Sequence, residues 1–221
     1  MNHRYCILRT IVCFVAFGAH LQGVGAETKS IGQQLADYSR SDTSQQGKDC
    51  YDAVYNRVKY VLTKHSKSLP EIHGRASETK PFKVLWITNY DFSNWKNIDA
   101  TYRACGPAGA LVSEGLATLV NHKNIWSGSL KPGAVVQVWD VWVGTKPSGE
   151  KVKGVEVFDA LHAGKNHEHK LGHSFIFLEY KKDAAGKIVG MTIADQGTQW
   201  NNPVTVTEKT FGFWVGANLK D

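Results

Sequence analysis

Residues 172–195 read GHSFIFLEYKKDAAGKIVGMTIAD. Two runs rich in apolar and β-branched residues, His173–Tyr180 and Ile188–Ala194, flank a short polar stretch. Asp183 and Gly186 in that stretch are typical turn residues, so the segment predicts two antiparallel strands joined as a hairpin. A sheet built from consecutive strands favours the α+β class over a parallel α/β fold.

Helical patterns precede this hairpin. Valines at 54, 58 and 61 recur at helical spacing and predict an amphipathic helix over 50–63, with a short helix before it near Ile31–Tyr38. A third helix is expected over 108–120, because Pro107 suits a first helical turn and apolar residues follow on one face. We therefore expect N-terminal helices packed on an antiparallel β-sheet.

Further strands are expected from short runs of β-branched and aromatic residues. These runs are Phe82–Thr88, Ala134–Val143, Val155–Phe158, Val204–Val206 and Phe211–Val215.

The first 26 residues have the pattern of a secretory signal peptide. Arg4 and Arg9 precede a short apolar run, and the small residues Val24-Gly25-Ala26 come before Glu27. The run is too short to span a membrane. We expect residues 1–26 to be removed, no stable membrane insertion, and a secreted or periplasmic protein. Residues 27–80 are then an N-terminal helical segment with a linker, and residues 81–221 the main domain.

Composition narrows the class of protein. With 221 residues, 42% of them hydrophobic and 21% charged, the chain is neither disordered nor a coiled coil. The formal charge of +6 falls by two when Arg4 and Arg9 leave with the leader. No block of basic residues or nucleic-acid motif accompanies this charge, so we expect no nucleic-acid partner.

Two cysteines, Cys50 and Cys105, remain in the mature chain. In an exported protein a pair of cysteines suggests a disulfide, but a low-pKa thiol at a helix start is a nucleophile. Cys105 stands directly before the helix that Gly106-Pro107 opens, where the helix dipole is expected to lower the pKa of its thiol.

A thiol nucleophile requires a nearby imidazole and a polar group that orients the imidazole. His173 begins one strand of the predicted hairpin and Asp195 follows the other, so both are expected at the same end of the sheet. The candidate catalytic residues are therefore Cys105, His173 and Asp195.

Three motifs together resemble bacterial papain-like cysteine peptidases and amidases. They are Cys105-Gly106-Pro107-Ala108, Leu130-Lys131-Pro132-Gly133 and Gly172-His173-Ser174-Phe175-Ile176-Phe177. The second and third are similar to NlpC-type and CHAP-type cell-wall hydrolases, and the first to bacteriocin-processing peptidases. The resemblance covers about residues 82–200 and implies a papain-like fold. It also implies amide-bond cleavage in peptidoglycan or another peptide, with Cys105 as nucleophile, His173 as base and Asp195 as orienting residue.

The chain also departs from these families. NlpC-type enzymes carry Asp-Cys-Ser around the nucleophile, whereas this chain has Ala104-Cys105-Gly106, and the Gln that processing peptidases place before the Cys does not occur between Trp86 and Cys105. Asp49-Cys50 also precedes a helix and resembles the NlpC-type motif more closely. Cys50 is therefore the rival nucleophile, although the Leu-Lys-Pro-Gly turn then lies 80 residues downstream.

Aromatic residues in predicted loops are candidate substrate contacts: Trp95, Tyr102, Trp126 and Trp200. The histidines at 162, 167 and 169 lack the spacing of a zinc site, and we expect neither metal nor organic cofactor.

The expected function is an exported cysteine hydrolase. Two alternatives remain: a secreted binding domain with a Cys50–Cys105 disulfide, and a cysteine acyltransferase or deamidase acting on protein. Whether an inhibitor protein binds the enzyme is left open.

Overall fold

A six-stranded antiparallel sheet organises the chain, in the order β1-β6-β2-β3-β4-β5. The structure is a computed structural model that describes residues 28–42, 49–72, 81–86, 98–139, 148–165, 167, 172–196 and 203–221. Its strands are β1 (Ala117–Val120), β2 (Val135–Trp139), β3 (Gly172–Lys182), β4 (Ile188–Ala194), β5 (Val204–Val206) and β6 (Phe213–Leu219). The predicted α+β class is therefore confirmed.

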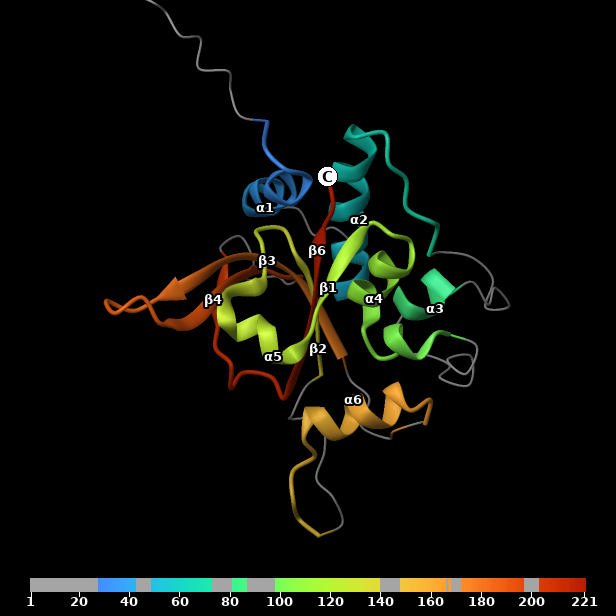
Figure 1. Cartoon of the computed structure of the whole chain (residues 1–221), viewed down its shortest axis with the longest axis vertical. Coiled ribbons are helices and arrows are strands. Elements are labelled where there is room, and N and C mark those ends of the chain that lie inside the picture. The colour runs from blue at the N-terminus through green and yellow to red at the C-terminus, as the bar shows by residue number, and fades with distance from the viewer. Residues whose placement is uncertain are drawn as a thin grey trace, which may run out of the picture.

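Six α-helices are described with the sheet (Figure 1). They are α1 (Ile31–Ser41), α2 (Cys50–Lys64), α3 (Pro81–Trp86), α4 (Gly106–Ser113), α5 (His122–Asn124) and α6 (Gly154–His162). Two short helical segments join them: η2 (Ala100–Tyr102) and η3 (Ile125–Ser129).

Alternating side chains of the strands face two hydrophobic clusters. Val135, Ile176 and Leu178 pack with buried residues of α1, α2, α3, α4 and α6. Phe175 and Phe177, the neighbours of Ile176 in β3, pack on the other face, in a cluster that includes residues of η3 and β6. α1 and α2 therefore share one core with the sheet and with α3, α4 and α6.

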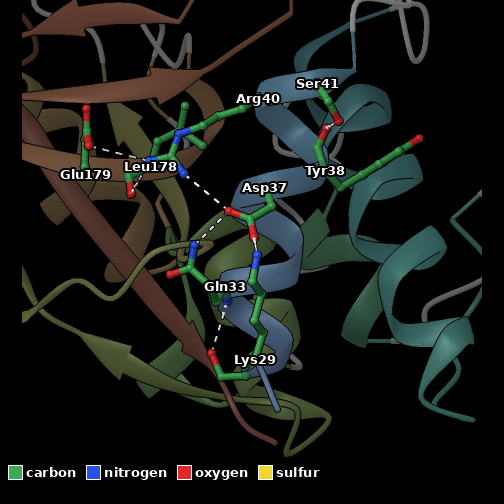
Figure 2. A network of polar contacts seen from close by, with 9 residues as sticks. Lys29, Gln33, Asp37, Tyr38, Arg40, Ser41, Leu178 and Glu179 are labelled. Atoms are coloured by element: carbon green, nitrogen blue, oxygen red, sulfur yellow. Dashed lines mark hydrogen bonds and ion pairs between the residues drawn. The ribbon is translucent and has the colours of Figure 1, made fainter. Parts of the chain in front are cut away.

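The first helix is tied to β3 by polar contacts (Figure 2). Arg40 lies 3.6 Å from Glu179 and donates a hydrogen bond of 3.4 Å to the backbone carbonyl of Leu178. On the same helix, Asp37 accepts hydrogen bonds from Lys29 and Gln33. These contacts fix the end of α1 against β3.

Three local predictions are wrong. Phe82–Thr88 was expected as a strand, but residues 81–86 form α3, because Phe82, Leu85 and Trp86 bury at helical spacing after Pro81. Val155–Phe158 was also expected as a strand and lies within α6, where Val157 and Leu161 bury one helical turn apart.

The third correction concerns the helix expected over 108–120. It ends at Ser113, and its predicted C-terminal part forms β1. Gly115 takes a φ of 72°, its N–H donates to the carbonyl of Val112, and that of Leu116 donates to Leu111. This is the Schellman termination, in which a left-handed glycine ends the helix.

Candidate functional site

The β3–β4 hairpin brings His173 and Asp195 together, as the sequence predicts. Ile176 pairs with Ala194 across the two strands, so His173 and Asp195 lie at the same end of the hairpin. The imidazole Nε2 lies 2.7 Å from Oδ2 of Asp195, and the carboxylate is 6% exposed while the imidazole is 27% exposed. The turn that sets this register contains Asp183, whose carboxylate accepts hydrogen bonds from two backbone N–H groups of the turn.

Asp195 is held on three sides. Its Oδ2 faces His173, and its Oδ1 accepts a hydrogen bond from the backbone N–H of Gln196. Its backbone carbonyl accepts a 3.0 Å hydrogen bond from Nη1 of Arg57, a buried residue of α2. The carboxylate is therefore presented to His173 in one orientation.

The thiol at this site belongs to Cys50. Cys50 is the first residue of α2, and Asp49 caps the helix by accepting a 3.0 Å hydrogen bond from the N–H of Asp52. The Cys50 side chain is partly exposed and lies near enough to His173 to raise the pKa of the imidazole. The start of α2 therefore supplies the thiol, and the β3–β4 hairpin supplies the imidazole and the carboxylate.

These contacts favour the charged imidazolium. Burial alone lowers the pKa of His173, but the hydrogen bonds with Asp195 and Cys50, together with their negative charges, raise the pKa to about 10. Because Nε2 is engaged by Asp195, Nδ1 is the ring nitrogen left for the sulfur. The arrangement suits an imidazolium that stabilises a thiolate and later returns a proton.

The structure corrects the expectation of an activated thiol at Cys105. Cys105 is only 2% exposed, and its Sγ lies 3.4 Å from the carbonyl of Arg103 and 3.7 Å from that of Thr101. Burial raises the pKa of this thiol to about 12. Cys105 does stand before α4, but at this site desolvation outweighs the helix dipole. Its packing and hydrogen bonds are those of a protonated core residue.

Cys50 and Cys105 are free thiols, so the disulfide expected between them in the binding-domain alternative is absent from the described residues. Cys50 belongs to the polar site with His173, while Cys105 belongs to the hydrophobic core beneath the helices.

The candidate substrate contacts are placed only in part. Trp95 and Trp200 lie outside the described residues. Tyr102 is partly buried against the helix-side core, and Trp126 packs edge-to-face on Trp214, 5.1 Å between ring centroids. Trp214 lies 5.2 Å from the ring of Phe211, which in turn lies 6.2 Å from the imidazole of His173. Trp126 is thus connected to the site through aromatic packing.

Two residues of the site escaped the sequence reasoning. Arg57 reaches the backbone of Asp195, and Phe211 packs against His173. Arg57 lies seven residues after Cys50 on α2, so its place on the same helical face was a signal available in the sequence.

The described residues contain no metal-binding cluster. Among the described residues, no group of three or more His, Cys, Asp or Glu side chains is placed to hold a metal ion. His162 instead stacks on Phe158 and contacts the carbonyl of Arg103.

Within the described ranges, no helix has the length and apolar character needed to cross a membrane. Comparison with protein-family models, curated proteins and solved structures found no match to this chain.

Proposed function

We propose that this protein is a cysteine hydrolase that cleaves an amide bond, with Cys50 as nucleophile, His173 as acid and base, and Asp195 as the residue that orients His173. The observation that carries the proposal is that one imidazole lies 2.7 Å from the Asp195 carboxylate and also lies near Cys50 at the start of α2, which raises the pKa of that imidazole. A thiol, an imidazole and an orienting carboxylate in this order are the components of nucleophilic acyl transfer.

The arrangement of elements supports a papain-like architecture. The nucleophile begins a helix that packs against an antiparallel sheet, the histidine begins a strand of that sheet, and the orienting residue follows the next strand. In this proposal, the motif that resembles the nucleophile region of NlpC-type hydrolases is Asp49-Cys50. The Gln that processing peptidases carry before their Cys also has counterparts here, Gln45 and Gln46, which lie outside the described residues.

The proposed reaction has two halves. In the first, the Cys50 thiolate attacks the carbonyl carbon of the amide, the C–N bond breaks, and the leaving amine takes a proton from the His173 imidazolium. The product of this half is a thioester on Cys50. In the second, His173 removes a proton from water as the water attacks the thioester, the C–S bond breaks to restore the Cys50 thiolate, and a carboxylic acid leaves and ionises in the solvent.

The start of α2 supplies stabilisation for the oxyanion in this proposal. The backbone N–H of Cys50 occupies the first helical position, where an amide donates outward along the helix axis. The start of α4 does not offer the same arrangement, because the Cys105 thiol is turned toward the backbone carbonyls of Thr101 and Arg103.

We assign peptides of the bacterial cell wall as the substrate class, on the strength of the cell-wall hydrolase motifs and the expected secretion of the chain. The same thiol and imidazole also serve deamidation or acyl transfer on proteins, so the assay must separate these outcomes.

The test uses the mature protein and two matched cysteine variants. Purified peptidoglycan and its soluble peptides are incubated with wild type, Cys50→Ala and Cys105→Ala, and new amine termini are identified by mass spectrometry. The proposal expects Cys50→Ala to abolish cleavage and Cys105→Ala to preserve it. Ammonia release from glutamine-bearing proteins in place of wall cleavage would reassign the reaction to deamidation. Cleavage that survives in Cys50→Ala and is lost in Cys105→Ala would overturn the assignment.

A further inference from the structure

Arg57 is a buried cation whose contacts converge on the candidate site. It is 4% exposed on α2. Its Nε lies 3.2 Å from Oδ2 of Asp42, and its Nη1 donates a 3.0 Å hydrogen bond to the backbone carbonyl of Asp195. Both side chains of the ion pair are nearly excluded from solvent, at 5% and 6% exposure.

Stability alone is a weak explanation for such a pair. Removing two charges from water carries a desolvation penalty that their attraction often only offsets, and hydrophobic replacements of buried ion pairs are frequently neutral. What distinguishes Arg57 is its second contact, since the carbonyl it binds belongs to the residue that orients His173.

The helical register explains how one element reaches both parts of the site. Arg57 lies seven residues after Cys50, close to two full turns, so the two side chains project from the same face of α2. Cys50 lies near His173, whereas Arg57 donates a hydrogen bond to the backbone carbonyl of Asp195. The helix thereby sets the distance between the nucleophile and the residue that orients its partner.

Asp42 is in turn fixed by α1. It caps the C-terminus of that helix, with its backbone N–H donating to the carbonyl of Tyr38. The contacts of Arg40 with Leu178 and Glu179 hold the same end of α1 on β3 (Figure 2). The chain of contacts therefore runs from β3 through α1 and Asp42 to Arg57 and Asp195.

We propose that Asp42 and Arg57 are positioning residues, which lock the backbone at Asp195 so that its carboxylate meets Nε2 of His173. This inference rests on the proposed function. It gives α1 a role in that function, because the helix holds Asp42 and through it the Asp42–Arg57 ion pair. Neither residue touches the reacting atoms; both act through Asp195.

The test replaces the whole ion pair so that no buried charge is left alone. The double variant Asp42→Leu/Arg57→Met is made in the Cys105→Ala background, where Cys50 is the mature chain's single thiol. The matched control is Lys59→Gln. Lys59 lies on α2, as Arg57 does, and the substitution removes its exposed ion pair with Glu71. Two readouts are compared: peptide hydrolysis, and the rate of Cys50 alkylation by iodoacetamide from pH 4 to 10.

We expect the double variant to fold, with Tm within about 4 °C of its parent. Its kcat should fall by about tenfold or more, as for a catalytic group displaced by a fraction of an ångström. KM should change by less than about twofold, because substrate binding is not touched. The alkylation profile should shift to higher pH, since the imidazolium partner of the thiolate is less well held. Arg57→Lys should recover part of both effects, because a lysine keeps the charge but lacks the fork that binds two acceptors.

The outcomes separate this inference from the proposed function. Alkylation of Cys50 in the parent with the pH profile of an ordinary thiol would overturn the proposed function. An activated thiol in the parent, with an unchanged profile and kcat in the double variant, would overturn the positioning role alone. If the double variant loses its cooperative unfolding transition, Arg57→Lys supplies the same two readouts, and a profile and kcat like the parent's would again overturn the role.

Discussion

Gly172 lies against the carboxamide of Gln137, so closely that a Cβ at Gly172 would stand 2.4 Å from Nε2 of that side chain. Gln137 is fully buried in β2, donates to the carbonyl of Val138 and accepts a 2.6 Å hydrogen bond from Ser174. Because Gly172 directly precedes His173, the glycine of the Gly-His motif lets the strand that carries the imidazole pack closely on β2.

This contact predicts that Gly172→Ala destabilises the protein by about 1–3 kcal/mol, the usual cost of overpacking a filled site. It should also slow hydrolysis, because relief of the clash displaces His173. Chemical denaturation and kcat measure the two effects. The Gln137→Ala background removes the clashing group, so the added cost of Gly172→Ala should shrink there. Equal costs in both backgrounds would show that the clash is not the cause.

Asp195 is expected to act through both its charge and its hydrogen bond. In Asp195→Ala the imidazole loses both, so the pKa of His173 should fall from about 10 toward its ordinary value and kcat should drop by about a hundredfold. Asp195→Asn keeps an acceptor for Nε2 and should retain more activity than Asp195→Ala. NMR titration of His173 and steady-state kinetics check these expectations; equal activity of the two variants would argue against an orienting role.

The raised pKa of His173 predicts how stability depends on pH. The folded pKa is about 10, against about 6.5 in the unfolded chain, so the folded state binds the proton more tightly. This contribution is complete below about pH 6.5 and is lost as the pH rises through about 10. Urea denaturation of wild type and His173→Gln across this range isolates the effect. Wild type should lose more free energy of unfolding with rising pH, and parallel curves would contradict the prediction.

Cys105 should report on global unfolding. With 2% exposure and a pKa raised to about 12, its thiol should resist alkylation in the folded protein and react only when the core opens. Mass spectrometry after brief labelling should find Cys50 modified and Cys105 intact. Destabilising variants such as Gly172→Ala should speed the labelling of Cys105. Comparable labelling of both thiols under native conditions would contradict the described burial.

The parts of the site that depend on short-range pattern were predictable. A turn with Asp183 and Gly186 between two apolar runs predicts a hairpin, and the pairing of its two strands brings His173 near Asp195. Local sequence is sufficient here because a hairpin joins neighbouring segments of the chain.

The choice between the two thiols was not accessible in this way. Cys50 and Cys105 both stand at helix starts, so each carries the same local signal. They differ in the long-range packing of their helices: α2 places Cys50 beside His173, whereas α4 places Cys105 under a buried layer. The Cys105 thiol is removed from water only when the core assembles around it, so the local sequence does not predict its burial.

The misassigned strands have a similar origin. Val155–Phe158 has the β-branched and aromatic composition of a strand, yet it forms α6, because Gly154 lies close to the Trp139 carbonyl and Val157 and Leu161 pack in the core. Tertiary packing overrides propensity in such short segments.

The last strand along the chain, β6, occupies an inner position of the sheet, between β1 and β2. Before Phe213–Leu219 pairs with the sheet, β1 has no neighbouring strand among the described ones and β2 has one unpaired edge. Unpaired strand edges promote aggregation. The sheet on which His173 and Asp195 depend therefore closes only when the C-terminal residues are in place. A nascent chain that does not yet include Phe213–Leu219 would carry Cys50 on α2 before the sheet that holds His173 is complete.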